Sequence, residues 1–356
     1  MFLFIILYGT LYLYAIKDVL RVYNKWYLYI PLLLITVIPS SLQYGTGTDY
    51  FSYIIIYNTE LNLESYIKKG EILFPYLIYF LKSMNLEAQS LFFCVSLFNG
   101  LLFSLLIKDL NKKGYSSWIF FFVFMTCTGV YHNQMNGLRQ YMAVYALPLV
   151  AIFLSEKRRI KSILYVLYGF FSHFSFILPL AGLFILSLRF FRKVNYFYLF
   201  VISLFVYKLL IPFLAINFVG IVFPAYKYYL LAERIEEANI ISIVTKLYYL
   251  PLILYFYYLL GKGLVVLNNN AEKFIILIFS STYWFFLASQ EISILGRAAQ
   301  YFYLFYSFPI YYVISYFYNK NKPVTFVLSV FYIFLPYVLK VTILAKNEYL
   351  YHWILS

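Results

Sequence analysis

The chain has 356 residues, of which 64% are hydrophobic, 24% aromatic and only 12% charged. Because a soluble domain carries about 25% charged residues, this composition excludes a soluble globular protein. It indicates an all-α polytopic membrane protein that forms a single integral membrane domain over residues 1–356. The net charge of +14 does not indicate a nucleic-acid partner, because the basic residues fall in short clusters between apolar segments, as they do in cytoplasmic loops.

A transmembrane helix needs roughly 20 apolar residues to cross about 30 Å of hydrocarbon. The candidate spans are, in chain order, 1–16, 26–43, 86–107, 117–132, 138–154, 196–216, 240–260, 274–292, 298–316 and 323–341. The first segment has no basic start and no cleavage site, so we interpret it as a retained helix. Segment 71–83 is short and contains Pro75, which predicts a half-helix in or under the outer interface. We expect about 10–12 transmembrane helices.

The positive-inside rule places the basic clusters in the cytoplasm. Residues 162–188 conflict with this rule, because basic clusters stand at both ends of the segment. A re-entrant broken hairpin resolves the conflict: one helix rises, the chain turns at residues 172–175, and a second helix descends with Pro179 in its first turn. Such half-helices are tolerated only against protein or a wet cavity. The alternative is one long tilted helix with His173 in its interior.

With this hairpin, the outer-face loops are about 44–70, 132–140, 217–239 and 293–300. Helices that start near Leu138 and Ala298 then run inward from the outer face, with Arg139 and Arg297 in their first turns. Ionisable side chains at the membrane are costly and indicate function. The two arginines and the positive helix starts behind them would together form one anion-binding surface.

The first polar segment lies directly after the second span. A carboxylate beside tyrosine rings suits a sugar, because the acid accepts hydroxyl hydrogens while the rings cover the apolar face of the sugar. The candidate substrate-binding residues here are Tyr44, Gly47, Thr48, Tyr50 and Tyr53, with Asp49 as a candidate catalytic residue. The alternative is a plain loop in which Thr48 or Asp49 caps a helix.

The second polar segment contains amides at a density that a simple interfacial turn does not need. Its candidate residues are Asn133, Gln134, Asn136, Arg139 and Gln140. Asn136 is a natural N-cap, and the guanidinium of Arg139 suits phosphate oxygens. The alternative is an interfacial loop whose arginine extends to lipid headgroups.

Two further groups complete the set. His173 stands between serines and phenylalanines, where a lone histidine is more often structural than catalytic. Glu291, Arg297, Gln300 and Tyr301 form the last group, in which Glu291 can pair with Arg297. There is no nucleotide loop and no cluster of metal ligands in the sequence, so we expect no cofactor and no metal.

The order of these motifs resembles the EpsG-like branch of the Wzy-type polysaccharide polymerases. The motifs are Gly47-Thr48-Asp49-Tyr50, Leu138-Arg139-Gln140, Phe171-Ser172-His173-Phe174-Ser175 and Gly296-Arg297-x-x-x-Tyr301-Phe302. The resemblance covers nearly the whole chain, although the aromatic-proline element usual near the end of the family is not evident.

The resemblance implies a metal-independent glycosyltransferase of GT-C-like architecture in the bacterial inner membrane, with its active site facing the periplasm or the outside. It would transfer a glycan from undecaprenyl pyrophosphate to a hydroxyl of another lipid-linked repeat unit, towards O-antigen, capsule or exopolysaccharide. The expected partners are these lipid-linked donors and acceptors, the lipid bilayer and a chain-length regulator. The alternatives are a lipid-linked oligosaccharide flippase and a membrane O-acyltransferase.

A general base must take the proton of the acceptor hydroxyl, and Asp49 and His173 are the candidates. A histidine has an ordinary pKa of about 6.5, and nearby arginines would keep it neutral. We therefore favour His173 as the base and Asp49 as the residue that orients the acceptor sugar.

Overall fold

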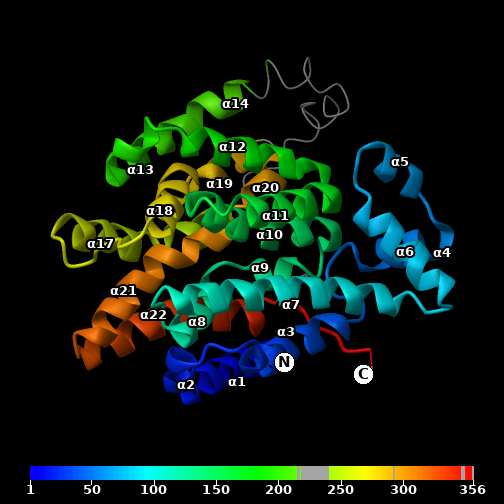
Figure 1. Ribbon diagram of the computed structural model, residues 1–356, viewed down its shortest axis with the longest axis horizontal. Coiled ribbons are helices and arrows are strands. Elements are labelled where there is room, and N and C mark those ends of the chain that lie inside the picture. The colour runs from blue at the N-terminus through cyan, green and yellow to red at the C-terminus, as the bar shows by residue number, and fades with distance from the viewer. Residues whose placement is uncertain (215–216, 218–239, 292, 346–348, 355–356) are drawn as a thin grey trace.

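The computed structural model describes residues 1–214, 217, 240–291, 293–345 and 349–354, and within this part the regular structure is helical (Figure 1). The only β-pairing found there is one bridge between Gln43 and Trp353. The predicted all-α polytopic fold is therefore confirmed. The predicted outer loop 217–239 falls almost entirely outside the described residues.

Six segments of the described chain are long and apolar enough to cross a membrane. They are α7 (Gln89–Lys112), α10 (Leu138–Ser155), Tyr196–Leu214, Ile243–Gly261, Asn270–Ser289 and α22 (Pro323–Val341). Four shorter apolar segments are Phe2–Ala15, Trp26–Ser41, Ser117–Cys127 and Phe174–Ser187. The predicted half-helix at 71–83 is present as α6 (Leu73–Ser83).

Several spans consist of consecutive helices with short breaks between them. The remaining elements are α1 (Phe2–Ala15), α2 (Lys17–Val22), η1 (Trp26–Tyr29), α3 (Ile30–Ser41), α4 (Tyr50–Thr59), α5 (Leu63–Lys68), α8 (Ser117–Cys127), α9 (Val130–Asn133), α11 (Arg159–Ser172), η2 (Phe174–Phe176), α12 (Ile177–Ser187), η3 (Phe191–Lys193), α13 (Tyr196–Phe205), η4 (Val206–Leu210), α14 (Ile211–Leu214), α16 (Ile240–Leu247), α17 (Leu250–Gly261), α18 (Asn270–Thr282), α19 (Phe285–Glu291), α20 (Ser293–Gln300), η8 (Tyr303–Tyr306) and α21 (Ser307–Asn319).

Helix α10 forms the centre of the bundle. Nearly all of its residues are buried, and it packs against α7, α11 and α18. Its 18 residues span about 27 Å at 1.5 Å per residue. Residues at its start and residues at its end therefore lie at opposite ends of the molecule. In Figure 1, α4, α5 and α6 lie together at the right, beyond one end of α7.

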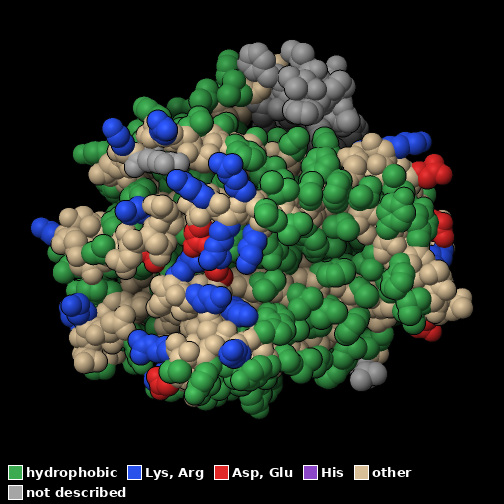
Figure 2. Space-filling view, viewed as in Figure 1, with side chains coloured by type: hydrophobic (Ala, Val, Ile, Leu, Met, Phe, Trp, Pro, Cys, Tyr) green, Lys and Arg blue, Asp and Glu red, His purple; other side chains and the backbone are tan. Residues whose placement is uncertain are grey.

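Charged side chains tie several helices together where α10 ends. Lys113, after α7, pairs with Asp109 and with Glu156, and Arg158 pairs with Glu156. Lys and Arg side chains gather on the left part of the face shown in Figure 2, while hydrophobic side chains cover its middle and right. We call the end that carries Lys113, Glu156 and Arg158 the basic end, which the sequence predicts to be cytoplasmic.

The segment 162–188 is broken at His173, as predicted. Helix α11 ends at Ser172, His173 has an extended backbone with φ −155° and ψ 123°, and η2 and α12 follow. A side chain at Gly169 would meet the ring of Phe176 at 2.6 Å, so only glycine allows this close approach after the break. Both helices are shorter than the roughly 20 residues of a full crossing.

Candidate functional site

The glycine-containing loop after α3 docks onto the start of α10. The backbone N–H of Asp49 and the hydroxyl of Thr48 both donate to Oδ1 of Asn136, at 2.9 and 3.1 Å. Gly47 has φ +81°, and a Cβ there would lie 2.8 Å from the same oxygen. The loop thus approaches Asn136 closely through a conformation that favours glycine.

Asn136 does not have the capping role that the sequence predicted. Gly137 is the N-cap of α10, and the side chain of Asn136 is engaged by the loop instead. Asp49 is the N-cap of α4, but its side chain makes no capping hydrogen bond.

The tyrosines of α4 are too buried to cover the apolar face of a sugar, as the sequence predicted for them. Tyr50 donates to Oε1 of Gln89 at 3.0 Å and Tyr57 to the carbonyl of Leu86 at 2.6 Å. Tyr53 is also buried, next to Phe74. Tyr44, by contrast, is half exposed and remains open to solvent beside the loop. These rings mainly pack the helix that carries Asp49.

Arg139 lies in the first turn of α10, as predicted, and is held from two sides. Its guanidinium pairs with the carboxylate of Glu71 and stacks on Tyr66, 3.8 Å from the ring centroid. Its Nε is buried and makes no hydrogen bond within the described part of the chain. An orphaned buried donor is costly, and it is available to an acidic ligand.

Glu71 also reaches the break at His173. Its Oε1 accepts a hydrogen bond from the backbone N–H of Phe174 at 3.0 Å and lies 3.8 Å from Nδ1 of His173. With 4% of its surface exposed, this carboxylate joins the start of α6, the start of α10 and the break at His173.

The hydrogen bonds of His173 fix its tautomer. Nδ1 accepts from the backbone N–H of Ser175 at 3.2 Å and from its hydroxyl at 2.8 Å, and Ser175 Oγ lies 3.0 Å from the hydroxyl of Tyr301. Because a backbone N–H can only donate, the neutral ring carries its proton on Nε2. A ring in this state donates from Nε2, an arrangement that favours a donor role over the predicted role as base.

Burial and three positive charges act on this imidazole. Burial, followed by the charges of Arg139, Arg297 and Lys69, lowers the pKa of His173 from 6.5 to about 3. The carboxylate of Glu71 is close enough to raise the pKa of His173, but it is already paired with Arg139 and accepts a hydrogen bond from the N–H of Phe174. The ring is therefore neutral at physiological pH.

Arg297 is close to α10 but differs from the prediction in its helix position. The side-chain amide of Gln140 donates to the backbone carbonyl of Arg297 at 2.6 Å, across 157 residues of sequence. Arg297 lies in the last turn of α20, not at the start of a helix, because the chain turns at Tyr301 and Phe302 before η8 and α21. The positive helix start expected behind it is absent. Its side chain is exposed, and its charge helps to lower the pKa of His173.

The other predicted residues are distributed around this centre. Tyr301 is fully buried against Ser175, and Gln134 is buried with Oε1 unpaired in the described chain. Asn133 and Gln300 are half-buried. The side chain of Glu291, and with it the predicted pair with Arg297, lies outside the described residues.

The sequence analysis missed Glu71 and Tyr66 as members of this cluster. Glu71 carried a signal, since it is an acid at the start of an apolar half-helix. Its partner is 68 residues away, however, and no local pattern connects the two. Within the described chain no group of three or more His, Cys, Asp or Glu side chains is placed to hold a metal ion.

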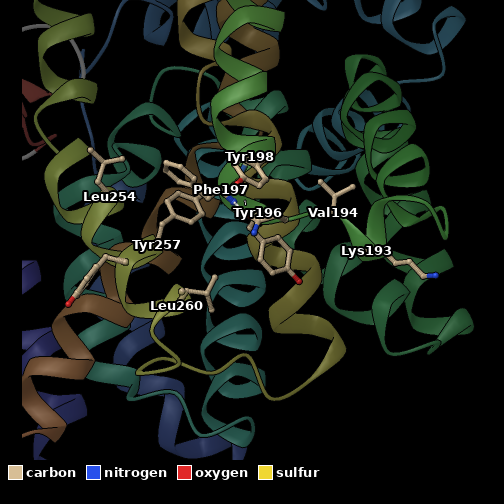
Figure 3. Close-up of a pocket in the computed structure, with 11 residues that line it drawn as sticks. Lys193, Val194, Tyr196, Phe197, Tyr198, Leu254, Tyr257 and Leu260 are labelled. Carbon is tan, nitrogen blue, oxygen red and sulfur yellow. Dashed lines mark hydrogen bonds between the residues drawn. The ribbon is translucent and has the colours of Figure 1, made fainter.

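A cavity of about 710 Å³ lies elsewhere, between α13 and α17 (Figure 3). It is lined by Lys193, Asn195, Tyr196, Phe197, Tyr257 and Gly261, among others. The labelled side chain of Lys193 extends away from the tyrosines in this view. None of the predicted site residues lines this cavity, so the candidate site is the cluster around Arg139 and His173.

Comparison with known proteins agrees with the motifs. The chain matches the model of the EpsG family over residues 25–353, and it belongs to this family. Membership points to a polysaccharide polymerase of the glycosyltransferase type that is associated with a bacterial membrane. No curated protein and no solved structure matches the chain.

Proposed function

We propose that this member of the EpsG family transfers a glycan from undecaprenyl pyrophosphate to a hydroxyl of another lipid-linked repeat unit. The reaction would take place at the outer face of the bacterial inner membrane. The observation that carries the proposal is that Arg139 and His173 both lie against the carboxylate of Glu71, where the charges of Arg297 and Lys69 also act on the imidazole. Such a cluster suits a doubly anionic leaving group better than a neutral sugar.

The two arginines would bind the pyrophosphate of the donor. As the bond between C1 of the sugar and the pyrophosphate oxygen breaks, its electron pair leaves with the pyrophosphate, where negative charge develops. Preorganised positive donors stabilise that charge. Arg139 fits this role because Glu71 and Tyr66 fix its orientation while its buried Nε has no hydrogen-bond partner among the described residues. The arginines would supply the charge that a divalent ion supplies elsewhere.

The proton of the attacking hydroxyl needs an acceptor. We assign this role to Asp49, because the Nδ1 lone pair of His173 is already used and its Nε2 carries a proton. His173 would instead donate from Nε2 to an oxygen of the donor. The half-buried Asp49 is attached to the start of α10 through Asn136, three residues before Arg139.

The proposal is tested with Arg139→Lys and Arg297→Lys, which keep the charge but lose the planar fork. Loss of one such donor should slow chain extension by about 10²–10³-fold. Arg159→Lys, at the exposed start of α11 on the basic end, is the matched control and should retain full activity. Full chain extension by both the Lys and the Ala variants, at normal expression, would rule the proposal out.

The product pattern of a deletion strain separates this function from the runner-up. A polymerase defect leaves single repeat units attached at the surface and removes only the long chains. A flippase defect removes every repeat unit from the outer face, and that result would overturn the proposal.

A further inference from the structure

The cavity between α13 and α17 is separate from the cluster around Arg139 and His173. It has a volume of about 710 Å³ and lies between the start of α13 and the end of α17. Phe197 and Tyr257 stand next to each other in it (Figure 3), with ring centroids 5.6 Å apart. The hydroxyl of Tyr257 lies 2.7 Å from that of Ser280. These rings join the two helices, and space remains beside them.

This cavity is at the basic end of the molecule. Tyr115, two residues after Lys113, meets Tyr312 with the two hydroxyl oxygens 2.6 Å apart. The ring of Tyr312 stacks on Phe256 with centroids 5.6 Å apart, and Phe256 directly precedes the cavity-lining Tyr257 in α17. Figures 1 and 2 agree, since α13 and α17 lie on the left, where Lys and Arg side chains gather. The cavity is therefore at the end that the sequence predicts to be cytoplasmic.

The helices beside the cavity present apolar side chains to the membrane. Tyr198, Leu254 and Tyr258 line the cavity and are exposed, and all three lie on candidate spans. In a membrane, exposed apolar side chains on such spans contact acyl chains. Lipid, rather than another segment of the described chain, therefore covers this side of the cavity.

The rim of the cavity is basic. Lys193 lines this cavity and also a neighbouring one of about 510 Å³, which Arg189 lines too. No Asp or Glu is among the described residues that line either cavity. In Figure 3 the side chain of Lys193 extends away from Phe197 and Tyr257. The positive charge and the apolar interior thus occupy different parts of the cavity, as the phosphate and the acyl chain do in a phospholipid.

We propose that an anionic phospholipid of the cytoplasmic leaflet binds at this cavity, with its phosphate at Lys193 and Arg189 and one acyl chain between α13 and α17. Basic pockets between transmembrane helices on the cytoplasmic side bind such headgroups. A zwitterionic headgroup fits less well, because no carboxylate among the described lining residues receives its ammonium group. The cavity shares no residue with the candidate site, so this inference does not rest on the proposed function.

The experiment titrates the full chain in detergent with phosphatidylglycerol and with phosphatidylcholine of the same acyl chains, and measures bound lipid by native mass spectrometry. The wild-type protein should bind phosphatidylglycerol more tightly. Each basic residue contributes about fivefold in affinity, so Arg189→Gln/Lys193→Gln should weaken phosphatidylglycerol binding about 25-fold and leave phosphatidylcholine binding unchanged. The control Lys320→Gln/Lys322→Gln removes the same charge at exposed positions that do not line the cavity, and it should keep the wild-type affinity.

A second pair of variants tests the position of the acyl chain. Gly261 in α17 and Gly182 in α12 are both helical, and an added Cβ at either would meet no atom within 4 Å. Only Gly261 lines the cavity. Gly261→Trp should fill the space and weaken phosphatidylglycerol binding about tenfold, which corresponds to lost contact of roughly two methylene groups. Gly182→Trp should leave the affinity unchanged.

Two results would overturn the phosphate site: equal wild-type affinities for the two lipids, or unchanged phosphatidylglycerol affinity in Arg189→Gln/Lys193→Gln. An equal loss in Lys320→Gln/Lys322→Gln would show general attraction to the basic end and would overturn the site as well. Unchanged affinity in Gly261→Trp would contradict the position of the acyl chain. The charge variants alter only exposed side chains, so they decide the headgroup site even if Gly261→Trp does not fold. Binding is measured without glycan transfer, so its outcome is independent of the proposed function.

Discussion

The carboxylate of Glu71 pairs with the guanidinium of Arg139, although 68 residues separate them in the chain. The same carboxylate accepts the N–H of Phe174 directly after the break at His173. Glu71 therefore sets the orientation of Arg139 and the position of His173 together. We interpret it as a positioning residue that prepares the anion site before substrate arrives.

The first prediction concerns this ion pair. Glu71→Gln leaves the buried Arg139 without its countercharge and should lower the free energy of unfolding by about 3 kcal/mol, since breaking a buried pair is costly. The double variant Glu71→Gln/Arg139→Met removes both charges and should recover much of that loss. Chain extension should stay low in both. The measurements are thermal unfolding in detergent and product length.

Glu64→Gln serves as the control for this pair. Glu64 lies 4.0 Å from Lys68, and both side chains are largely exposed, so little should change. Wild-type chain extension by the Glu71→Gln/Arg139→Met variant would contradict the positioning role, because stability would then be the only contribution of the pair.

The second prediction concerns pH. The pKa of His173 is lowered to about 3 from 6.5 by burial and by Arg139 and Arg297. Between these values the unfolded chain binds a proton that the folded chain does not, so stability is fully present above pH 6.5 and falls as the pH drops. From pH 7 to pH 5 the loss through this residue should be about 2 kcal/mol.

This loss of stability between pH 7 and pH 5 should be absent in His173→Asn. It should be unchanged in the control His352→Asn, because His352 is exposed on the C-terminal segment. Chain extension by the wild-type protein should likewise show no histidine-dependent decline near pH 6. A decline near pH 6 that disappears in His173→Asn would return the role of base to this histidine.

The third prediction isolates the close approach of the loop to Asn136. Gly47→Ala and Gly114→Ala both place an alanine at similar positive φ, +81° and +86°, but only Gly47 has atoms within 4 Å of the added Cβ. The shared left-handed strain costs about 1–2 kcal/mol. Gly47→Ala should destabilise the protein further and slow chain extension, because the loop that carries Asp49 would move away from α10. Equal effects of the two substitutions on unfolding temperature would contradict the docked loop.

Much of the fold followed from the sequence because its signals are local. Apolar run length predicted the spans, and the basic clusters at both ends of 162–188 predicted a break that the structure has at His173. The sequence also predicted that the segments containing Arg139 and Arg297 lie close together, because both were assigned to the same side of the membrane. The hydrogen bond from Gln140 to Arg297 agrees with that expectation.

Other features were decided only by tertiary structure. Arg297 ends α20 instead of starting a helix, and Asn136 binds the glycine loop instead of capping α10, because contacts between distant segments outweighed local preference. Composition and periodicity determined that this chain is a helical membrane protein and which polar residues are exceptional in it. They could not determine that Glu71 fixes Arg139 or that Ser175 occupies Nδ1 of His173. Those properties depend on distances between side chains far apart in sequence, and only folding sets such distances.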